Sequence, residues 1–543
     1  MDFPWLAVAS VSALGSSVLS YAQNSRSWGF LAGSFAFVWY LQVTVWFTYS
    51  AIVYPYFLSP LRHLPEPAGS HWLMGQATTI RKEPTGAPAR RWVQEIPHKG
   101  LIRYRWFFNR ERVLPCSAKA LAEVLVTKSY SFQKPAPASR FLSRVLGDGL
   151  LVVEGDEHKH QRRQLMPAFS FRHVKNLYPV FWSKARESVL AMTAEVGGRK
   201  GAEMEVSNWA SRVGLDIIGT AGMGRDFGAI QDAKNPLVES YNKLFVPTGS
   251  DRILFILGFV IPFTVLNRLP FQSRVNEASA TKKIKSVCRE LIAAKKAILA
   301  RGEKLNVDIL SVAMESGGFT DEDLVSQMMT FLAAGHETTA SAISWAVYTL
   351  CRYPEIQQRL REEIRERLPA IDDDREVTSS DIDTMPYLNA FCNEVLRYWS
   401  PVPQTVREAS HDTTILGQPI PKGTIVFISP KAVNVDPELW GPDAGEFKPE
   451  RWLRTSEDDK AAASGGATSN YAFLSFLHGP RSCIGQGFAK AEFACVLAAW
   501  VGRFQFEFRD EEDADESKLD IRGGLTARLY KGMHVKMTVL DGF

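Results

Sequence analysis

Two apolar runs near the beginning of the chain constrain its architecture more than any other feature. Residues 3–22 and 28–54 carry no charged side chain. About 20 apolar residues are enough to cross a hydrocarbon core roughly 30 Å thick. The second run is long enough to span with some tilt, whereas the first is richer in Ser and Gly and is the weaker candidate. We therefore expect a membrane anchor over residues 1–60, with either one or two transmembrane helices.

The charges around these runs predict the orientation of the chain. Arg62, Arg81 and Lys82 follow the second run, and the positive-inside rule places such residues in the cytosol. No Lys or Arg precedes the first run, which argues against a cleaved signal peptide. A buried core helix does not account for two such runs in succession.

The rest of the composition is that of an ordinary globular protein. Hydrophobic residues make up 45% and charged residues 22% of the sequence, so a large core can be buried. A net charge of +4 on 543 residues is too small to predict binding to nucleic acid. The six cysteines are scattered without a C-x-x-C pair, which argues against a disulfide framework or a structural zinc site.

Periodicity predicts a mainly helical structure with a minor β component. A capping box at Thr320 begins a helical pattern that continues to Pro354. A second helix is predicted over residues 386–399. Two short strands are predicted over residues 413–416 and 424–428, joined by a turn that contains Pro and Gly. The prediction is an α-rich fold with small β-sheets.

Three other segments differ in composition from their surroundings. Residues 253–266 are apolar but too short to cross a bilayer, so they form either a core segment or a loop that dips into the membrane surface. Residues 456–470 are a low-complexity surface loop, and residues 510–516 are an acidic one. No internal repeat is visible, and we expect residues 61–543 to form a single large domain.

The stretch FLSFLHGPRSCIGQG carries the most specific chemical signal. Its spaced residues are Phe476, Gly479, Arg481, Cys483 and Gly485. A thiolate ligand to a haem iron needs one cysteine on a rigid loop that lies close to the porphyrin. The two glycines permit a close backbone approach, Arg481 supplies a cation for a haem propionate, and Phe476 can exclude water from the sulfur.

This pattern resembles the haem-binding loop of the cytochrome P450 family. The resemblance implies that Cys483 is the axial ligand of the iron in haem b, which is iron protoporphyrin IX. It implies that Phe476, Arg481 and Gly485 bind the same cofactor, in a single α-rich domain. His478 falls at a variable position of the pattern, so it is not expected to be a ligand.

The long predicted helix contains a segment similar to the oxygen-activation segment of that family, AGHETT. Glu337 and Thr338 hold the positions of the acid and the alcohol, which relay protons to bound dioxygen. They are the predicted catalytic residues. Gly335 is expected to leave room for a local distortion of the helix.

A structural network is predicted from a Glu-x-x-Arg pair. Glu394 and Arg397 share one helix face because they are three residues apart. The resemblance adds Arg451, which completes a buried network that fixes the thiolate loop. Glu362 and Arg365 have the same spacing but lie in a charged run, and we expect them to be solvated.

Two further arginines match positions that bind haem propionates in the family. Arg162 lies in a segment similar to the helix that crosses the haem edge, and Arg407 matches the arginine that begins a small sheet. The family often has tryptophan where this chain has His158, so a contact between His158 and the haem is less certain than one from Arg162.

The resemblance implies a monooxygenase that inserts one atom of dioxygen into a substrate, with electrons from an NADPH–cytochrome P450 reductase. Such enzymes lie in the endoplasmic reticulum membrane with the catalytic domain in the cytosol, so membrane lipid is an expected partner. The positive charges expected to face the reductase are Lys159, Arg162, Arg163 and Lys490.

The expected substrate is a lipophilic small molecule, because the residues expected to line the pocket are mostly apolar. These are Phe331 to Ala334, with residues 131–151, 402–406 and 523–527. The chain resembles fungal oxidases of secondary metabolism, which act on terpenoids, polyketides or alkaloids. A fatty-acid hydroxylase, a haem-thiolate isomerase or dehydratase, and a haem-binding sensor are the alternatives.

Overall fold

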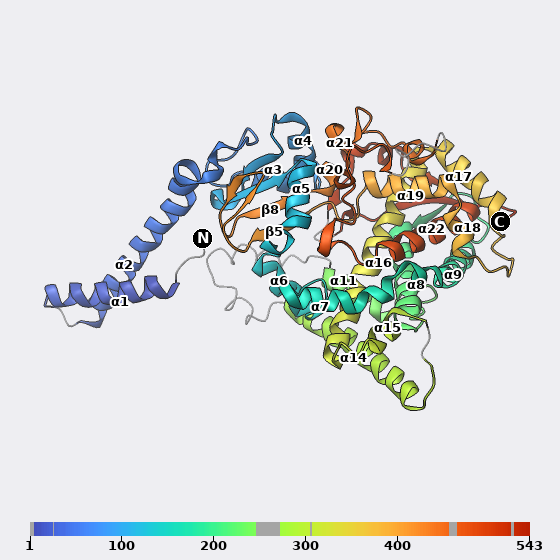
Figure 1. Cartoon of the computed structure of the whole chain (residues 1–543), viewed down its shortest axis with the longest axis horizontal. Helices are drawn as coiled ribbons and strands as arrows, with labels where there is room; N and C mark the ends of the chain where they lie inside the picture. The colour runs from blue at the N-terminus through green and yellow to red at the C-terminus, as the bar shows by residue number, and fades with distance from the viewer. Residues whose placement is uncertain (1–4, 25–26, 246–271, 305–306, 455–463, 523–525) are drawn as a thin grey trace.

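Helices make up most of the structure, as the sequence predicts. The computed structural model describes residues 5–24, 27–245, 272–304, 307–454, 464–522 and 526–543. The apolar segment at 253–266 and residues 456–463 of the predicted low-complexity loop lie outside these ranges. Helices and small sheets pack into one body, and two N-terminal helices project from it (Figure 1).

The helix α16 (Asp321–Arg352) crosses the body and forms the centre of the core. Its predicted capping box is confirmed, since the Asp323 N–H donates to Thr320 Oγ1 at 3.2 Å and the Thr320 N–H donates to Asp323 Oδ2 at 2.9 Å. At about 1.5 Å per residue the helix is roughly 48 Å long. Its neighbours in the core are α10 (Val206–Ile217), α14 (Gln272–Ala300), α19 (Pro386–Tyr398) and α22 (Gln486–Arg503).

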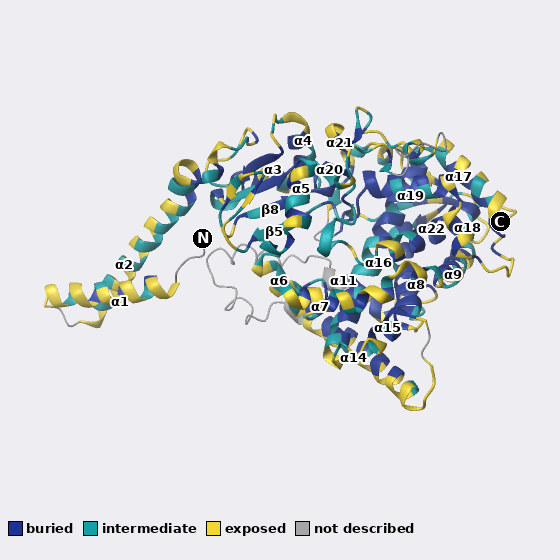
Figure 2. Cartoon of the chain, viewed as in Figure 1, coloured by how far each residue is buried: buried dark blue, intermediate teal, exposed yellow. Residues whose placement is uncertain are grey.

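Figure 2 shows that the faces of α16, α19 and α22 turned toward one another are buried. The predicted helix over residues 386–399 is therefore confirmed, with Pro386 in its first turn. The other main helices are α3 (Ala77–Lys82), α4 (Ala87–Glu95), α5 (Ala118–Ala122), α6 (Ala136–Leu146), α7 (Gly155–Leu165), α8 (Phe171–Lys175), α9 (Tyr178–Val196), α11 (Pro236–Phe245), α15 (Ile309–Glu315), α17 (Pro354–Arg367), α18 (Ser379–Asp383), α20 (Pro430–Val433) and α21 (Pro437–Trp440).

The β component consists of small sheets. One has the strand order β1 (Leu101–Arg105), β2 (Glu111–Pro115), β8 (Ile425–Ile428), β5 (Thr405–Ala409) and β3 (Phe132–Gln133). Another has the order β4 (Ala202–Glu205), β12 (His534–Val539) and β9 (Phe504–Phe508). The remaining two are the pairs β6 (Thr413–Ile415) with β7 (Gln418–Ile420) and β10 (Ile521–Arg522) with β11 (Arg528–Leu529).

The two predicted strands exist, but their predicted connection is wrong. β6 pairs with β7, whereas β8 lies in the five-stranded sheet between β2 and β5. The turn between β6 and β7 has Leu416 at φ 52° and Gly417 at φ 77°, and two residues with positive φ match the twist of a hairpin. Leucine rarely adopts this conformation, so residue types alone do not predict a turn at this position.

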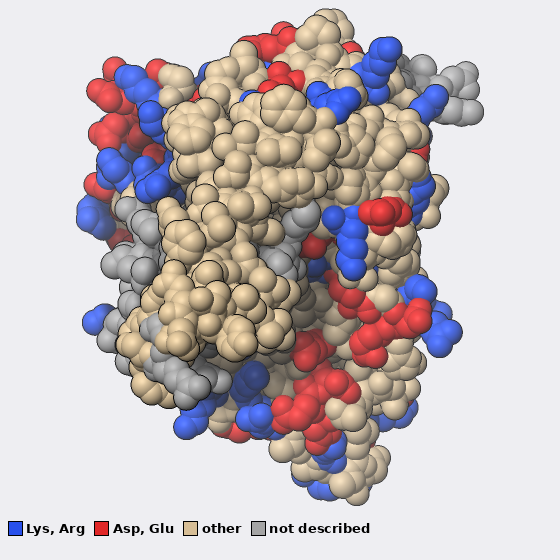
Figure 3. Space-filling model, turned by 90° about the vertical axis from the view of Figure 1, so that its left-hand side faces the viewer, with Lys and Arg blue, Asp and Glu red and all other residues tan. Residues whose placement is uncertain are grey.

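The two projecting helices are α1 (Trp5–Ala22) and α2 (Trp28–Thr48), and α2 continues as the π-helical segment η1 (Tyr49–Leu58). Both are long and apolar enough to cross a membrane. Seen from the side on which they project, their surface lacks charged side chains over residues 5–24 and 27–58 (Figure 3). The end of η1 is attached to the body, since Arg103 donates to the Pro55 carbonyl and Asn109 to the Ala51 carbonyl, both at 2.8 Å.

Candidate active site

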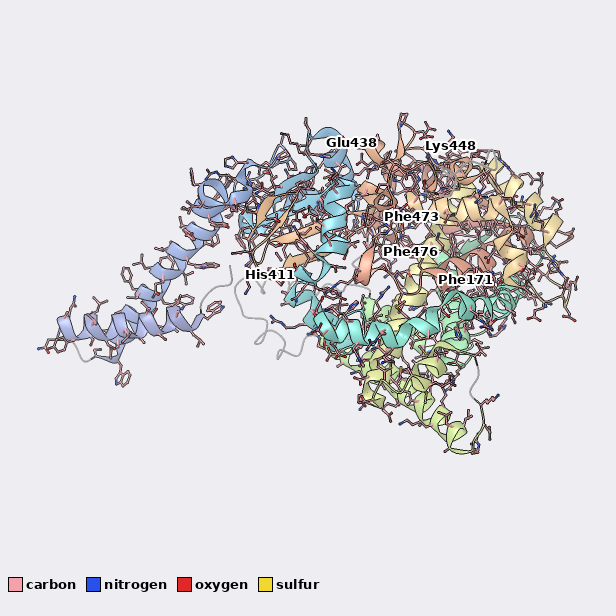
Figure 4. The ribbon with its side chains drawn as sticks, viewed as in Figure 1. Phe171, His411, Glu438, Lys448, Phe473 and Phe476 are labelled. Carbon is pink, nitrogen blue, oxygen red and sulfur yellow. The ribbon has the colours of Figure 1, made fainter. Side chains whose placement is uncertain are left out.

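The loop before α22 presents Cys483. The Cys483 N–H donates to the Phe476 carbonyl at 2.8 Å, which closes the loop. Within it, Leu477 has a φ of 55° and Gly479 a φ of 77°. The rings of Phe473 and Phe476 lie 6.4 Å apart on the same loop, near the middle of the body (Figure 4).

The two glycines of the loop differ in what the protein itself requires of them. A Cβ atom on Gly479 would lie 2.2 Å from the Leu125 carbonyl oxygen, so a side chain cannot be placed there. Gly485 has a φ of −88°, and a Cβ atom there would contact the Phe169 ring at 3.6 Å, which is an ordinary distance. The protein fold thus explains Gly479, and any need for glycine at 485 arises from a bound group.

Cys483 differs from the other cysteines in its surroundings. The other five are buried, and Cys483 is exposed. Its thiol is nevertheless surrounded by enough protein that burial raises its pKa, against the opposing effects of the Gly485 N–H and the charge of Arg162. The sulfur is thus accessible but largely shielded from bulk water. That is the environment in which a cysteine can become a metal-bound thiolate.

His478 bonds within its own loop. Its Nε2 atom lies 3.1 Å from the Phe473 carbonyl oxygen, and its ring packs against Tyr471 with centroids 5.1 Å apart. The His478 imidazole therefore stabilises the loop through contacts with residues of the same segment.

Arg481 is a buried cation beside Cys483. Its side chain is 6% exposed and forms an ion pair with Glu154. None of its three guanidinium nitrogens forms a well-oriented hydrogen bond, and the guanidinium lies 5.0 Å from the centre of the Tyr130 ring. A buried guanidinium with free donors is costly unless an anion binds it.

Arg407 and Lys134 add charge to the same region. Arg407, on β5, is 6% exposed, and burial together with the charge of Arg481 lowers its pKa to about 10. Burial lowers the pKa of Lys134 to about 8, and Arg407 and Arg481 act in the same direction. Among the described residues, Glu154 is the carboxylate that binds Arg481 and Lys134.

This excess of buried cations fits a group that carries carboxylates, such as the two propionates of haem. Arg162 extends the region toward the thiol, because its guanidinium donates to the carbonyl and hydroxyl oxygens of Ser482 at 2.8 and 3.2 Å. The structure therefore brings together Arg162, Arg407, Arg481 and Cys483. A haem-thiolate group fits these residues.

His158 lies at the edge of the cationic region. Its Nδ1 atom is 3.2 Å from the Tyr130 hydroxyl. Burial lowers its pKa to about 4, and the charges of Arg481, Lys134 and Arg162 contribute. The imidazole is therefore neutral at pH 7.

Glu337 and Thr338 are adjacent on α16, but their side chains bind different partners. The Thr338 hydroxyl donates to the Ala334 carbonyl at 2.8 Å. Glu337 Oε1 accepts from the Thr526 hydroxyl at 2.9 Å and lies 3.1 Å from Arg528 Nη1. In the described part of the chain no hydrogen bond joins the acid to the alcohol.

Two expectations about α16 are wrong. The helix continues through Gly335 without a distortion, and this glycine is explained by packing, since a Cβ atom there would approach Ile218 to 3.2 Å. Leu332 and Ala333 are buried in the core at 0% and 2% exposure, so they do not line an open pocket. Phe331, Ala334 and Thr338 are half-buried and share the other face.

Phe169 connects this face of α16 to the Cys483 loop. Its ring meets the Phe331 ring edge-on with centroids 5.4 Å apart. A Cβ atom placed on Gly485 would lie 3.6 Å from the same Phe169 ring. The helices α16 and α22 are also joined directly, because Thr339 donates to the buried Glu492 at 3.2 Å. The predicted oxygen-activation segment and the Cys483 loop are thus neighbours.

Glu394 and Arg397 form a bidentate ion pair in which Arg397 Nη2 and Nε donate to the two carboxylate oxygens at 2.7 and 2.8 Å. Both side chains are fully buried. Glu394 also accepts hydrogen bonds from Arg451 at 3.1 Å, from the Trp452 indole at 2.9 Å and from the Lys448 N–H at 2.8 Å. The structure therefore brings the three residues of the predicted network together.

The network continues into the Cys483 loop. Arg397 donates to the Asn434 carbonyl at 2.8 Å, and the Asn434 side chain donates to Ser475 Oγ at 2.8 Å and accepts from the Leu474 N–H at 2.7 Å. Ser475 in turn donates to the Leu396 carbonyl. The start of the loop is therefore fixed to α19.

The sequence predicts that Glu362 and Arg365 are solvated, and for Arg365 this prediction is wrong. Arg365 donates to the carbonyls of Gly502 and Asp541 at 2.9 and 3.0 Å. It binds the end of α22 and the C-terminal residues, while Glu362 accepts a solvent-exposed side-chain bond from Gln358 at 2.8 Å.

Several residues of the site have no individual sequence signal, although Lys134 and Thr526 lie in the segments 131–151 and 523–527 that are expected to line the pocket. Tyr130, Lys134 and Glu154 join the cationic region, and Thr526 and Arg528 bind Glu337. None belongs to a spaced pattern, because the fold brings them from separate loops and strands.

The chain is similar to known proteins over most of its length. A protein-family model described as Cytochrome P450 matches residues 65–530. Cytochrome P450 monooxygenase sphH of Aspergillus fumigatus is 47% identical over 503 residues, which cover 91% of each chain. Cytochrome P450 monooxygenase FUM15 of Gibberella moniliformis is 42% identical over 539 residues and 90% of each chain. Cytochrome P450 monooxygenase ALT8 of Alternaria alternata is 40% identical over 557 residues, 92% of this chain and 93% of the relative.

Proposed function

Because the chain belongs to the cytochrome P450 family and is an oxygen-incorporating oxidoreductase, we propose that it is a haem b enzyme that hydroxylates or epoxidises a lipophilic small molecule. The observation that carries this proposal is the accessible Cys483 sulfur beside a group of buried cations in which Arg481 and Lys134 share one carboxylate, Glu154. The same residues account for an iron ligand and for two carboxylates.

Each residue of the site has a role in this proposal. Cys483 binds the iron, Arg162, Arg407 and Arg481 bind the propionates, and Phe476 shields the sulfur from water. When bound, the haem activates dioxygen so that one atom enters the substrate and the other leaves as water. Burial raises the pKa of the Cys483 thiol, and the Gly485 N–H and the charge of Arg162 oppose this effect, so both groups favour the thiolate that the iron needs.

Glu337 and Thr338 deliver the protons that this reaction consumes. The carboxylate takes a proton from the solvent side, and Thr338, whose hydroxyl donates to the Ala334 carbonyl in this structure, passes a proton on from the half-buried face of α16. An isomerase or dehydratase that rearranges an oxygenated substrate needs no such pair, so the pair favours monooxygenation.

The electrons come from a redox partner, which we propose to be an NADPH–cytochrome P450 reductase. Of the four cations expected to face it, Lys159 and Arg163 are exposed on α7, and Lys159 forms a solvent-exposed ion pair with Asp156 at 2.7 Å. Arg162 is bound to Ser482, and Lys490 donates to Asn393 at 2.8 Å, so both are engaged within the protein. Docking therefore relies on Lys159 and Arg163.

We propose that residues 1–60 anchor the domain formed by residues 61–543 in the endoplasmic reticulum membrane, with that domain in the cytosol. The burial pattern of α1 supports the anchor. Its buried residues are Val8, Ser12 and Ser16, while Leu6 and Leu14 are 86% and 68% exposed. A helix that buries serine and exposes leucine is suited to lipid, not to water.

The contact between α1 and α2 favours two spans. Gln42 donates to Ser12 Oγ at 2.9 Å, and Ser12 donates to the Val8 carbonyl at 2.8 Å. Gly15 allows a close contact, because a Cβ atom placed on it would lie only 3.4 Å from the Val38 side chain. Small residues at the contact and a polar bond across it are how helices associate in a bilayer. We propose a helical hairpin whose two ends both face the cytosol.

The substrate is proposed to be a secondary metabolite of terpenoid, polyketide or alkaloid type. The fungal monooxygenases to which the chain is similar support this class. Comparative metabolite profiling of a deletion strain tests it. Accumulation of a lipophilic precursor that lacks one oxygen atom is the expected result, whereas a change confined to hydroxylated fatty acids would contradict it.

A further inference from the structure

Three successive turns of α16 bind a short segment near the C-terminus, residues 526–528. Glu337 accepts from the Thr526 hydroxyl at 2.9 Å. Ser341 and Trp345 both donate to the Ala527 carbonyl, at 2.7 and 3.0 Å. Because residues four apart lie one above another on a helix, these three side chains hold the segment along the helix axis.

The segment is also fixed on its other side. The Ala527 N–H donates to the Pro401 carbonyl at 2.8 Å, and Arg528 is paired with Arg522 in the hairpin of β10 and β11. The backbone that carries Arg528 therefore has little freedom relative to α16.

Arg528 is the cation that faces Glu337. Its Nη1 atom lies 3.1 Å from Glu337 Oε1, and the two side chains are 33% and 13% exposed. The acid is thus mostly enclosed while its partner reaches solvent. The neighbouring His336 is buried, and its burial lowers its pKa, so Arg528 is the charged side chain that compensates the carboxylate.

From this geometry we infer that Arg528 is a positioning residue for Glu337, and that residues 526–528 form part of the proton route from solvent. The inference rests on the proposed function of Glu337. In each delivery Glu337 takes one proton from solvent water and passes one proton inward. Its carboxylate is then restored, Arg528 remains charged, and no electron moves through the pair.

A thermal double-mutant cycle tests the coupling without turnover. The four holoproteins are the natural chain, Arg528→Gln, Glu337→Gln and the double variant. If the pair is coupled, the second substitution changes Tm less than the same substitution made alone. Arg522→Gln is the matched control, because Arg522 pairs with Asp520 at 2.6 Å, and its effect should add to that of Glu337→Gln. Additive effects of Arg528→Gln and Glu337→Gln would overturn the inference.

The fate of electrons tests the positioning role. The holoenzyme is supplied with NADPH, reductase and dioxygen, without added substrate, and the fraction of electrons recovered in hydrogen peroxide is measured. Arg528→Gln is expected to raise this fraction at least about two-fold, since slower proton delivery favours release of peroxide over formation of water. Arg528→Lys should restore at least half of the difference, and Arg522→Gln should change nothing.

An Arg528→Gln variant with the peroxide fraction of the natural chain would overturn the positioning role. Each variant is first checked for the red-shifted ferrous–CO band. If the natural chain lacked that band, the proposed function would fail, while the Tm cycle would still decide whether Arg528 holds Glu337. The two failures are therefore distinguishable.

Discussion

At Gly479 the backbone of the Cys483 loop passes so close to the Leu125 carbonyl that a methyl group would lie 2.2 Å from the oxygen. The positive φ of 77° adds strain for any other residue. Gly479→Ala is therefore expected to displace the loop and to abolish haem incorporation, measured as Soret absorbance per protein.

Gly487→Ala is the matched control for this prediction. Gly487 lies four residues after Cys483 in α22, and nothing lies within 4 Å of its Cβ position. Its substitution should leave the haem content at the natural level. Equal haem content in both variants would show that the approach of Gly479 to Leu125 is not required.

His158 gives a second prediction at the scale of one residue. Burial lowers its pKa from 6.5 to about 4, so between these values the unfolded chain binds a proton that the folded chain does not. The neutral side chain therefore adds to the free energy of unfolding above about pH 6.5. This contribution, at most about 3 kcal/mol, is lost as the pH falls toward 4.

His158→Gln cannot bind this proton but can still hydrogen-bond Tyr130. The Tm of the natural protein should therefore fall more steeply than that of the variant between pH 6.5 and 4.5. Parallel curves would contradict the lowered pKa of His158.

The residues of the site were predictable from the sequence only where they occur in spaced patterns. Cys483, Arg481 and Glu394 were found because their neighbours have fixed spacing. Glu154 and Arg528 were not, because each meets its partner only through the fold, across 327 and 191 positions of sequence respectively.

At the scale of helices and strands, Glu394 connects α19 to the segment around Arg451 and, through Asn434, to the Cys483 loop. It accepts bonds from Arg397, Arg451 and Trp452 and is fully buried. Glu394→Ala would leave Arg397 as an uncompensated buried charge, which costs about 3–5 kcal/mol. We expect a large loss of Tm and of haem-loaded protein.

Glu362→Ala supplies the control, because Glu362 has the same spacing from an arginine but its bond with Gln358 is exposed to solvent. Its removal should cost less than about 0.5 kcal/mol. A similar loss of Tm in both variants would mean that burial of the Glu394 network is not what stabilises the fold.

The helices were easier to predict than the strand pairings for a physical reason. The bounds of α16 and α19 follow from local signals, namely the Thr320 cap and Pro386 in the first turn. The pairing of β8 with β2 and β5 joins residues far apart in sequence, and nothing local specifies such contacts.

At the scale of the whole molecule, the account predicts how the chain lies in the membrane. If α1 and α2 form a hairpin of two spans, the connection between them is lumenal and the N-terminus is cytosolic. An N-glycosylation acceptor inserted in that connection should be glycosylated, and one added before residue 1 should not.

Glycosylation at both sites would instead show a single span formed by α2, with α1 on the lumenal side. Gln42→Leu is a useful companion variant, because it removes the bond to Ser12 without adding charge. It should weaken the hairpin and leave the orientation of α2 unchanged.

The central claim is that Cys483 is the thiolate ligand of the haem iron, and the ferrous–CO difference spectrum tests it most directly. The natural protein and a Cys351→Ala control, in which a different, buried cysteine is removed, should both show the red-shifted band that thiolate ligation produces. The account predicts that Cys483→Ser loses that band. A red-shifted band that survives in Cys483→Ser would contradict it.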